Sequence, residues 1–363
     1  MIFLKNILIV IGTRPEAIKM CPLVLEMKRR GGFLVRVLAT GQHGEMLYSA
    51  LGFFGVTPDY SLDFTAGGTL ADITEKVMRG TTEVLAKEKF DAVLVHGDTS
   101  SAFAAALAAF YARVPIGHVE AGLRTHNIRE PYPEEFNRAA IDAMAEYFFA
   151  PTCCAKQNLL AEGKPAERIF VTGNTVIDAL AYTVRADFAH PALDFAKGRR
   201  LMLITAHRRE NLGGAMAAMF RGISRALAEN PSWCAVFPVH KNPLVRTAAE
   251  IFEGNAQVKL TEPLDVGDFH NILSRAELAV TDSGGVQEEC AHLGVPVLVM
   301  RSVTERQEAV GAGAAHLIGN TEESIFEGIC AFMRREKERG AKGKSIYGDG
   351  RASERIANIL AGE

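Results

Sequence analysis

The chain has 363 residues, of which 48% are hydrophobic and 23% charged, values typical of a globular protein with two domains. Its formal net charge is -3 and it has no long basic stretch, which argues against a nucleic-acid partner. The longest apolar run, Ala102 to Ala112, is too short to cross a membrane.

Apolar runs alternate with helical stretches through the first half of the chain. The predicted strands are Ile7–Ile11, Leu34–Ala39, Ala92–Val95, Ile116–Val119, Tyr147–Ala150 and Ile169–Val171. Helices are predicted between them, including Asp72–Lys87 and Ser101–Ala112. This alternation indicates a parallel sheet covered by helices.

The alternation stops at a polar segment, Arg185 to Arg199, which is interpreted as a linker or surface excursion. It restarts with the predicted strands Leu201–Thr205, Cys234–Pro238, Val258–Leu260, Leu278–Val280, Val297–Val299 and Ala315–Ile318. Two successive units predict an α/β fold of two Rossmann-like domains that face a cleft. We place the N-terminal domain at residues 1–172 and the C-terminal domain at 173–347, with a helix at 348–363 packing back on the first.

Ligands bind such sheets at the carboxyl ends of the strands, so the loops there hold the candidate site residues. The loop after the first strand brings Arg14 and Lys19 to a helix start, where two cations suit phosphate oxygens. The alternative interpretation is a capped helix with exposed charges.

Carboxylates occupy three later loops of the first half. Asp98 and Glu120 each follow a predicted strand, and Glu134 with Glu135 begins a helix after Pro133. Each acid alone is explained by helix capping or by the helix dipole. Acids on three successive loops of one sheet edge indicate acid–base chemistry instead, although the sequence does not choose between Glu134 and Glu135.

A glycine turn connects a strand to a helix in the second half. Its small residues are Ser283, Gly284 and Gly285. The backbone N–H groups at such a helix start suit a phosphate. The neighbouring acids would repel a phosphate and are therefore expected to face sugar hydroxyls; they are Asp282, Glu288 and Glu289. The alternative is a helix cap with flexible glycines.

Other strand ends of the second half carry cations or histidines, which favour an anionic ligand. These residues are His207, Arg208, His240, Lys241 and Arg306. A nucleoside diphosphate held mainly by the second domain, with sugar chemistry against the first, accounts for this distribution. The six cysteines have no metal-binding spacing and fit reduced thiols, so we expect no metal and a cytoplasmic location.

Taken together, these segments resemble the non-hydrolysing UDP-N-acetylglucosamine 2-epimerases. The matching segments are Gly12–Met20, Thr40–His43, Leu94–Thr99, Gly117–Thr125, Pro133–Arg138, Gly173–Leu180, Ala206–Asn211, Pro238–Pro243, Thr281–Glu289, Gly294–Arg301, Thr304–Arg306 and Tyr347–Gly350. They follow the family order and cover nearly the whole chain. Any one of them is weak evidence, and the set is very specific.

The resemblance implies the glycosyltransferase-B-type fold with an interdomain cleft. It implies reversible inversion at C2 of UDP-N-acetylglucosamine, giving UDP-N-acetylmannosamine for cell-surface polysaccharides, without a cofactor. In the family, UDP leaves by anti elimination to give 2-acetamidoglucal and then adds back. The family also suggests a homodimer, for which the helices at 72–87 and 101–112 have a suitable apolar content.

The resemblance also implies roles for single residues. The catalytic positions of the family match Asp98, Glu120, Glu134 and His207. Its UDP-binding positions match Ser283, Gly284, Gly285, Glu289 and Arg306, and its uracil-stacking position matches Phe269. Arg14 and Lys19 are expected to stabilise the departing pyrophosphate with His207. The segments that bind a second UDP-N-acetylglucosamine as activator contain Gln42, His43, Arg208 and His240.

The chain departs from the family pattern at a few positions. Gly44 replaces a common arginine beside the activator segment, which bears on allostery. Val266-Gly267 replaces a tyrosine-leucine pair and Gln307 a proline, changes that would loosen the uracil pocket. Four alternatives remain: a hydrolysing epimerase, an epimerase for 2,3-diacetamido sugar acids, a glycosyltransferase and a catalytically silent nucleotide-sugar sensor. The presence of all four catalytic positions argues against the sensor, and no acceptor-binding segment supports the glycosyltransferase.

Overall fold

The computed structural model describes residues 4–41, 44–62, 68–208, 211–334 and 346–363. The chain divides into two compact units, residues 1–182 with 347–363, and residues 183–346. The sequence analysis had placed this division after residue 172. Helix α7 (Thr175–Thr183) lies mostly in the first unit, where Asp178 accepts hydrogen bonds from the backbone N–H groups of Ala352 (3.2 Å) and Ser353 (2.7 Å).

The first unit contains a seven-stranded sheet in the order β3-β2-β1-β4-β5-β6-β7, with every pairing parallel. Its strands are β1 (Lys5–Ile11), β2 (Phe33–Ala39), β3 (Tyr60–Ser61), β4 (Ala92–His96), β5 (Ile116–Val119), β6 (Tyr147–Ala150) and β7 (Ile169–Val171). The sequence analysis missed β3 because two residues are too short to leave a pattern. The other strands are confirmed, with small shifts at their ends.

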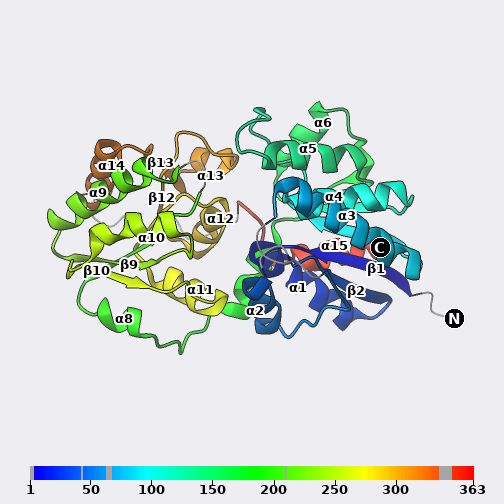
Figure 1. Cartoon of the computed structure of the whole chain (residues 1–363), viewed down its shortest axis with the longest axis horizontal. Helices are drawn as coiled ribbons and strands as arrows, with labels where there is room; N and C mark the ends of the chain where they lie inside the picture. Colours follow the sequence, from blue (N-terminus) through cyan, green and yellow to red (C-terminus); the bar gives the residue numbers. More distant parts are fainter. Residues whose placement is uncertain (1–3, 42–43, 63–67, 209–210, 335–345) are drawn as a thin grey trace. The chain divides into compact units, whose positions relative to one another are not determined.

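Helices cover both faces of this first sheet (Figure 1). They are α1 (Arg14–Arg30), α2 (Gly44–Phe53), α3 (Leu70–Lys87), α4 (Ser100–Tyr111), α5 (Glu134–Met144), α6 (Cys153–Ala161), α7 and α15 (Ala352–Ala361). Helix α4 packs between α3 and α5, and α1 packs against α2 and α15. Eight residues of the alanine-rich α4 are buried, because their small side chains allow the helix to lie close to the sheet.

The second unit repeats this topology with a six-stranded parallel sheet in the order β10-β9-β8-β11-β12-β13. Its strands are β8 (Arg200–Thr205), β9 (Trp233–Pro238), β10 (Val258–Thr261), β11 (Leu278–Thr281), β12 (Val297–Val299) and β13 (Ala315–Leu317). Its helices are α8 (Pro191–Phe195), α9 (Gly214–Ala228), α10 (Pro243–Ala249), α11 (Val266–Arg275), α12 (Gly284–Leu293), α13 (Gln307–Gly311) and α14 (Glu322–Arg334). The α/β class and the two parallel sheets confirm the sequence-based prediction.

The segment interpreted as a linker, residues 185–199, is part of the second unit and contains α8. The backbone N–H of Arg185 donates to Asn271 (2.8 Å), and Arg275 donates back to the carbonyls of Arg185 (2.8 Å) and Ala186 (3.1 Å). These contacts fasten the segment to α11. The segment is therefore part of the second domain and does not link the two units.

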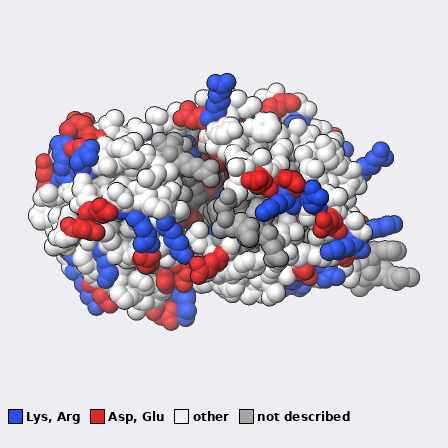
Figure 2. Space-filling model, viewed as in Figure 1, with Lys and Arg blue, Asp and Glu red and all other residues white. Residues whose placement is uncertain are grey.

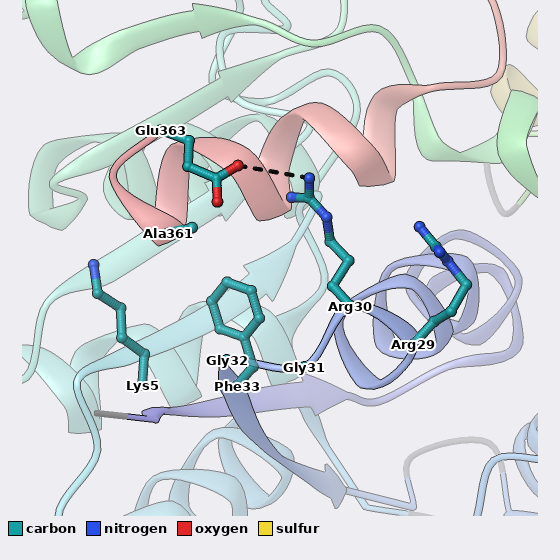
Figure 3. Close-up of a pocket in the computed structure, with 8 residues that line it drawn as sticks. All are labelled: Lys5, Arg29, Arg30, Gly31, Gly32, Phe33, Ala361 and Glu363. Carbon is teal, nitrogen blue, oxygen red and sulfur yellow. Dashed lines mark ion pairs between the residues drawn. The ribbon is translucent and has the colours of Figure 1, made fainter. Parts of the chain in front are cut away.

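The chain end returns to the first unit beside the amino ends of β1 and β2 (Figure 3). There Lys5 donates to the carbonyl of Leu360 at 2.7 Å, and Arg30 points toward Glu363 at 3.7 Å. A pocket of about 510 Å³ lies between these groups. Because ligands of doubly wound sheets bind at the carboxyl ends of the strands, this pocket lies at the wrong edge for the predicted site.

Charged side chains of both signs are interspersed on the face drawn in Figure 2. That face has no continuous basic stripe among its described residues, in agreement with the net charge of -3. Within the described part of the chain, no helix is long and apolar enough to cross a membrane.

Candidate functional site

In each sheet the strand order reverses between two adjacent central strands, and the loops that follow those strands form a topological switch point. In the first unit these strands are β1 and β4, followed by Gly12 to Thr13 and by Gly97 to Thr99. In the second unit they are β8 and β11, followed by Ala206 to Arg208 and by Asp282 to Ser283. The predicted site residues are concentrated on these loops and on their neighbours.

Glu16 joins the two switch-point loops of the first unit. It caps the start of α1 with Thr13, and its carboxylate accepts the N–H groups of Gly12 (2.5 Å) and Thr13 (2.6 Å). It also accepts the hydroxyl of Thr99 (2.6 Å), beside Asp98. Burial raises the pKa of Glu16 to about 7, although these hydrogen bonds act to lower it. Sequence reasoning missed this residue because a capping glutamate is common.

Glu120 lies directly after β5 in a left-handed backbone conformation, with a φ of 72°. Its Oε2 atom accepts hydrogen bonds from the Lys19 ammonium and from Asn174 (2.6 Å), and the His96 Nε2 atom lies 3.5 Å away. Burial lowers the pKa of His96, which favours the neutral imidazole. A non-glycine residue in this conformation is strained, so the surrounding contacts must hold it.

Lys19 was predicted to lie near phosphate oxygens, and the structure pairs its ammonium with Glu120. Arg14, the other predicted cation, is the first residue of α1 and is half-buried. Asn174 was not singled out from the sequence. It belongs to the Gly173–Leu180 segment. Its position directly after the strand β7 is the sequence feature that could have identified it as a candidate site residue.

Asp98 retains a 26% exposed side chain and accepts hydrogen bonds from both the Nε (3.1 Å) and the Nη2 of Arg138. The Asn137 side chain donates to the Asp98 carbonyl at 2.9 Å. Arg138 is almost completely buried and also binds Glu135 (3.0 Å), so α5 controls the direction of Asp98. Sequence reasoning did not assign Arg138.

The structure separates the two acids that the sequence left equivalent. Glu135 is buried and accepts the backbone N–H groups of Thr125 (2.9 Å) and His126 (3.0 Å). It therefore has a scaffolding role. Glu134, the first residue of α5, is only half-buried, so part of its surface is accessible to a ligand.

In the second unit the N-terminus of α12 is open toward a ligand. Ser283 is the N-cap residue, but its side chain makes no capping hydrogen bond. A Cβ atom on Gly284 would lie 2.4 Å from Nη1 of Arg306, so this glycine is required by packing. A Cβ atom on Gly285 would meet nothing within 4 Å. The two glycines therefore have different roles, and Gly285 is the one beside open space.

Two acids expected to face sugar hydroxyls do not do so. Asp282 is completely buried and accepts the backbone N–H groups of His207 (3.1 Å) and Arg208 (3.0 Å). Glu288 is also completely buried and binds the Nε of Arg306 (2.8 Å). That part of the prediction is wrong, because neither carboxylate has surface accessible to a ligand.

Glu289, the third acid, lies 3.3 Å from Nε2 of His270, whose Nδ1 is 2.8 Å from the Thr183 hydroxyl. Its Oε2 atom is buried and has no hydrogen-bond partner within the described residues. A ligand hydroxyl would satisfy it. The half-buried ring of Phe269 neighbours His270 on α11, with ring centroids 6.0 Å apart.

His207 is the most accessible of the predicted catalytic side chains described here, with 45% of its surface exposed. Its ring stacks on that of His240 at a centroid distance of 5.7 Å. Arg208 points to Glu305 (3.3 Å), and Arg306 lies between Glu305 and Glu288 as a buried bridge. Of the predicted activator residues, Gln42 and His43 lie outside the described residues.

Within the described residues, no group of three or more histidine, cysteine or acidic side chains is arranged to hold a metal ion. Each unit has its own group of candidate site residues. The first unit offers carboxylates with different surroundings, Glu120 and Asp98, and the second offers an open helix N-terminus. Such groups suit proton transfer at carbon and binding of a phosphorylated ligand.

A family model described as UDP-N-acetylglucosamine 2-epimerase matches residues 25–361 of this chain. UDP-N-acetylglucosamine 2-epimerase of Bacillus subtilis is 48% identical over 359 residues, covering 98% of this chain and 94% of that protein. Staphylococcus aureus MnaA, solved with UDP, is 44% identical with a TM-score of 0.95, over 98% of this chain and 96% of that chain. The Neisseria meningitidis UDP-GlcNAc 2-epimerase, solved with UDP-GlcNAc, is 39% identical with a TM-score of 0.94. The match covers 99% of this chain and 100% of that chain.

Proposed function

The chain belongs to the UDP-N-acetylglucosamine 2-epimerase family, and from that premise we propose that it is an enzyme of the non-hydrolysing kind. It interconverts UDP-N-acetylglucosamine and UDP-N-acetylmannosamine by inversion at C2. The observation that carries the proposal is the pair of carboxylates Glu120 and Asp98, which occupy neighbouring strand-end loops but have different partners.

The reaction begins with removal of the weakly acidic C2 proton by a carboxylate. The electron pair forms the C1–C2 double bond as the C1–O bond to UDP breaks in an anti elimination, leaving 2-acetamidoglucal. UDP then adds back at C1 while a second acid protonates the opposite face of C2. Two carboxylates with different environments divide these tasks, and the candidates for them are Asp98, Glu120 and Glu134.

The second unit holds UDP. The diphosphate binds the uncapped N-terminus of α12 at Ser283 and Gly285. The unpartnered Oε2 of Glu289 accepts ribose hydroxyls, and Phe269 stacks on uracil. His207, with Arg14 and Lys19, stabilises the pyrophosphate as it leaves.

The remaining expectations belong to the same proposal. The enzyme works in the cytoplasm as a homodimer and supplies a cell-surface polysaccharide precursor. Exposed aromatic side chains at the end of α4, Phe110 (52%) and Tyr111 (67%), would be covered in such a dimer. A second UDP-N-acetylglucosamine acts as activator beside Arg208 and His240, and the glycine at position 44, where an arginine is common, bears on this activation.

Proton NMR of the protein with UDP-N-acetylglucosamine in deuterated water tests the proposal. We expect deuterium at C2 of both nucleotide sugars, a mixture of the two epimers and little free sugar. Accumulation of free N-acetylmannosamine with UDP would assign the hydrolysing reaction instead. Absence of C2 exchange with ample enzyme would exclude epimerisation.

A further inference from the structure

The buried residues His118 and Asp142 join the two loops that carry Asp98 and Glu120. His118 lies on β5, Asp142 on α5, and neither side chain has any exposed surface. The Nδ1 atom of His118 is 2.6 Å from Oδ1 of Asp142, and its Nε2 atom is 2.8 Å from the carbonyl oxygen of Gly97. Because His118 has no exposed surface, it cannot contact the substrate itself.

The partners of the ring determine its protonation. A carbonyl oxygen only accepts hydrogen bonds, so Nε2 of His118 must donate to Gly97. The other oxygen of Asp142 accepts the N–H of Gly122 (3.2 Å) and the guanidinium of Arg124 (2.7 Å), whose positive charge favours the ionised carboxylate. Burial opposes ionisation of Asp142, but the charges of His118 and Arg124 outweigh it and lower its pKa. With Asp142 ionised, its Oδ1 atom only accepts, so Nδ1 would donate as well and the ring would be an imidazolium.

The charges around the ring balance. Asp142, on α5, neutralises His118, and Arg124, on the loop after β5, also binds Glu162 at the end of α6 (2.6 Å and 2.7 Å). His118, Asp142 and Arg124 thus form a buried network, which Glu162 continues to the surface with a 36% exposed side chain. Buried charges persist only when they are paired and hydrogen-bonded in this way.

This network holds both loops within two residues of the proposed catalytic acids. Gly97 precedes Asp98, has a φ of 64°, and is bound through its N–H to Val119 (2.9 Å) as well as through its carbonyl to His118. Gly122, two residues after Glu120, has a φ of 85° and donates to Asp142. The peptides beside both acids are therefore tied to one ion pair.

We propose that His118 is a positioning residue for the reaction, a doubly protonated imidazolium that, with Asp142, fixes the Asp98 loop and the Glu120 loop in one relative geometry. The inference rests on the proposed function, because it concerns the two carboxylates assigned to proton transfer at C2. Catalysis of this kind requires the acids to be placed accurately, and a displacement of about 1 Å costs on the order of 100-fold in rate.

The first measurement is nitrogen-15 NMR of the unaltered protein with labelled histidine. Among the ten histidines, we expect one ring with protons on both nitrogens that exchange slowly with water, because His118 is inaccessible. The His118→Gln variant removes this signal, and Asp142→Asn shifts it. A ring at position 118 with one unprotonated nitrogen would overturn the proposal, as would the absence of any such protected imidazolium from the unaltered protein.

The second measurement is the steady-state rate together with deuterium exchange at C2. His118→Gln is expected to lower kcat about 100-fold and to change KM less than about threefold, with exchange falling in parallel. His316→Gln, at an exposed position on β13, is the matched control and keeps full activity. A folded His118→Gln variant with normal kcat would refute the positioning role.

These measurements separate two kinds of failure. If the unaltered protein shows no C2 exchange, the proposed function fails, whereas the NMR signature still decides whether His118 is an imidazolium. If His118→Gln does not fold, the spectrum of the unaltered protein and the Asp142→Asn variant decide the protonation state.

Discussion

The acids at the strand ends of the two units differ in what they bind. In the first unit, Asp98 and Glu120 are bound by side chains, those of Arg138, Lys19 and Asn174. In the second unit, Asp282 is completely buried and accepts the backbone N–H groups of its neighbouring loop. An acid after a parallel strand can thus serve chemistry or hold a loop, and the donors distinguish the two roles here, since Glu120 is itself buried.

The largest expected effects, on kcat and on stability, come from replacing one strand-end aspartate by asparagine in each unit. Asp98→Asn should lower kcat about 1000-fold, because an amide cannot transfer the proton. Its stability should fall by only about 1 kcal/mol, since Arg138 keeps its ion pair with Glu135. Asp282→Asn should instead lower the free energy of unfolding by about 2–3 kcal/mol, because an amide N–H would face backbone N–H groups.

Steady-state kinetics and urea unfolding of both variants measure this contrast. Kinetic values for the Asp282→Asn variant are taken per folded molecule. Equal losses of stability in the two variants, or full activity of Asp98→Asn, would contradict the division between chemical and scaffolding acids.

Glu16 extends the comparison between chemical and scaffolding acids. It lies in the first unit but, like Asp282, is buried and accepts backbone N–H groups of a strand-end loop. Its pKa is raised by burial from 4.5 to about 7, so between these pH values the folded protein binds more protons than the unfolded chain. The stabilisation is complete below about pH 4.5 and is lost as the pH rises through about 7. Relative to Glu16→Gln, the unaltered protein should gain up to about 3 kcal/mol on acidification across this window.

Thermal unfolding of both proteins in overlapping buffers checks this pH dependence. Glu253→Gln is a control, since that side chain is exposed and its removal should leave the pH profile unchanged. Parallel profiles for Glu16→Gln and the unaltered protein would show that Glu16 titrates normally.

The smallest effect concerns the adjacent glycines of α12. Gly284→Ala places a methyl group 2.4 Å from Arg306, which is held by Glu288 and Glu305, and should cost about 2 kcal/mol of stability. Gly285→Ala meets open space and should raise stability by up to about 1 kcal/mol through helix propensity.

Calorimetric titration with UDP completes this test. The methyl group of Gly285→Ala should weaken binding about tenfold if the diphosphate approaches the backbone there, because one methyl group in that contact costs on the order of 1–2 kcal/mol. Unchanged affinity in a stable Gly285→Ala variant would place UDP elsewhere.

The sequence predicted the two parallel sheets well, because strands buried on both faces are continuous apolar runs and are bounded by glycine or polar residues. It also located the loops with Asp98, Glu120 and Ser283, since these follow recognisable strands. It failed for Asp282 and Glu288. Their partners come from the loops after β8 and β12, which no local pattern contains.

The order of apolar runs and turns by itself therefore determined the α/β class, the succession of strands and the loops that hold the candidate site. Tertiary structure alone decided which acid is accessible and which is buried, as between Glu134 and Glu135. It also decided that Asn174 and Arg138 bind the proposed catalytic carboxylates. The physical reason is that hydrogen bonding and desolvation depend on groups distant in sequence, whereas apolar periodicity is a local property of the chain.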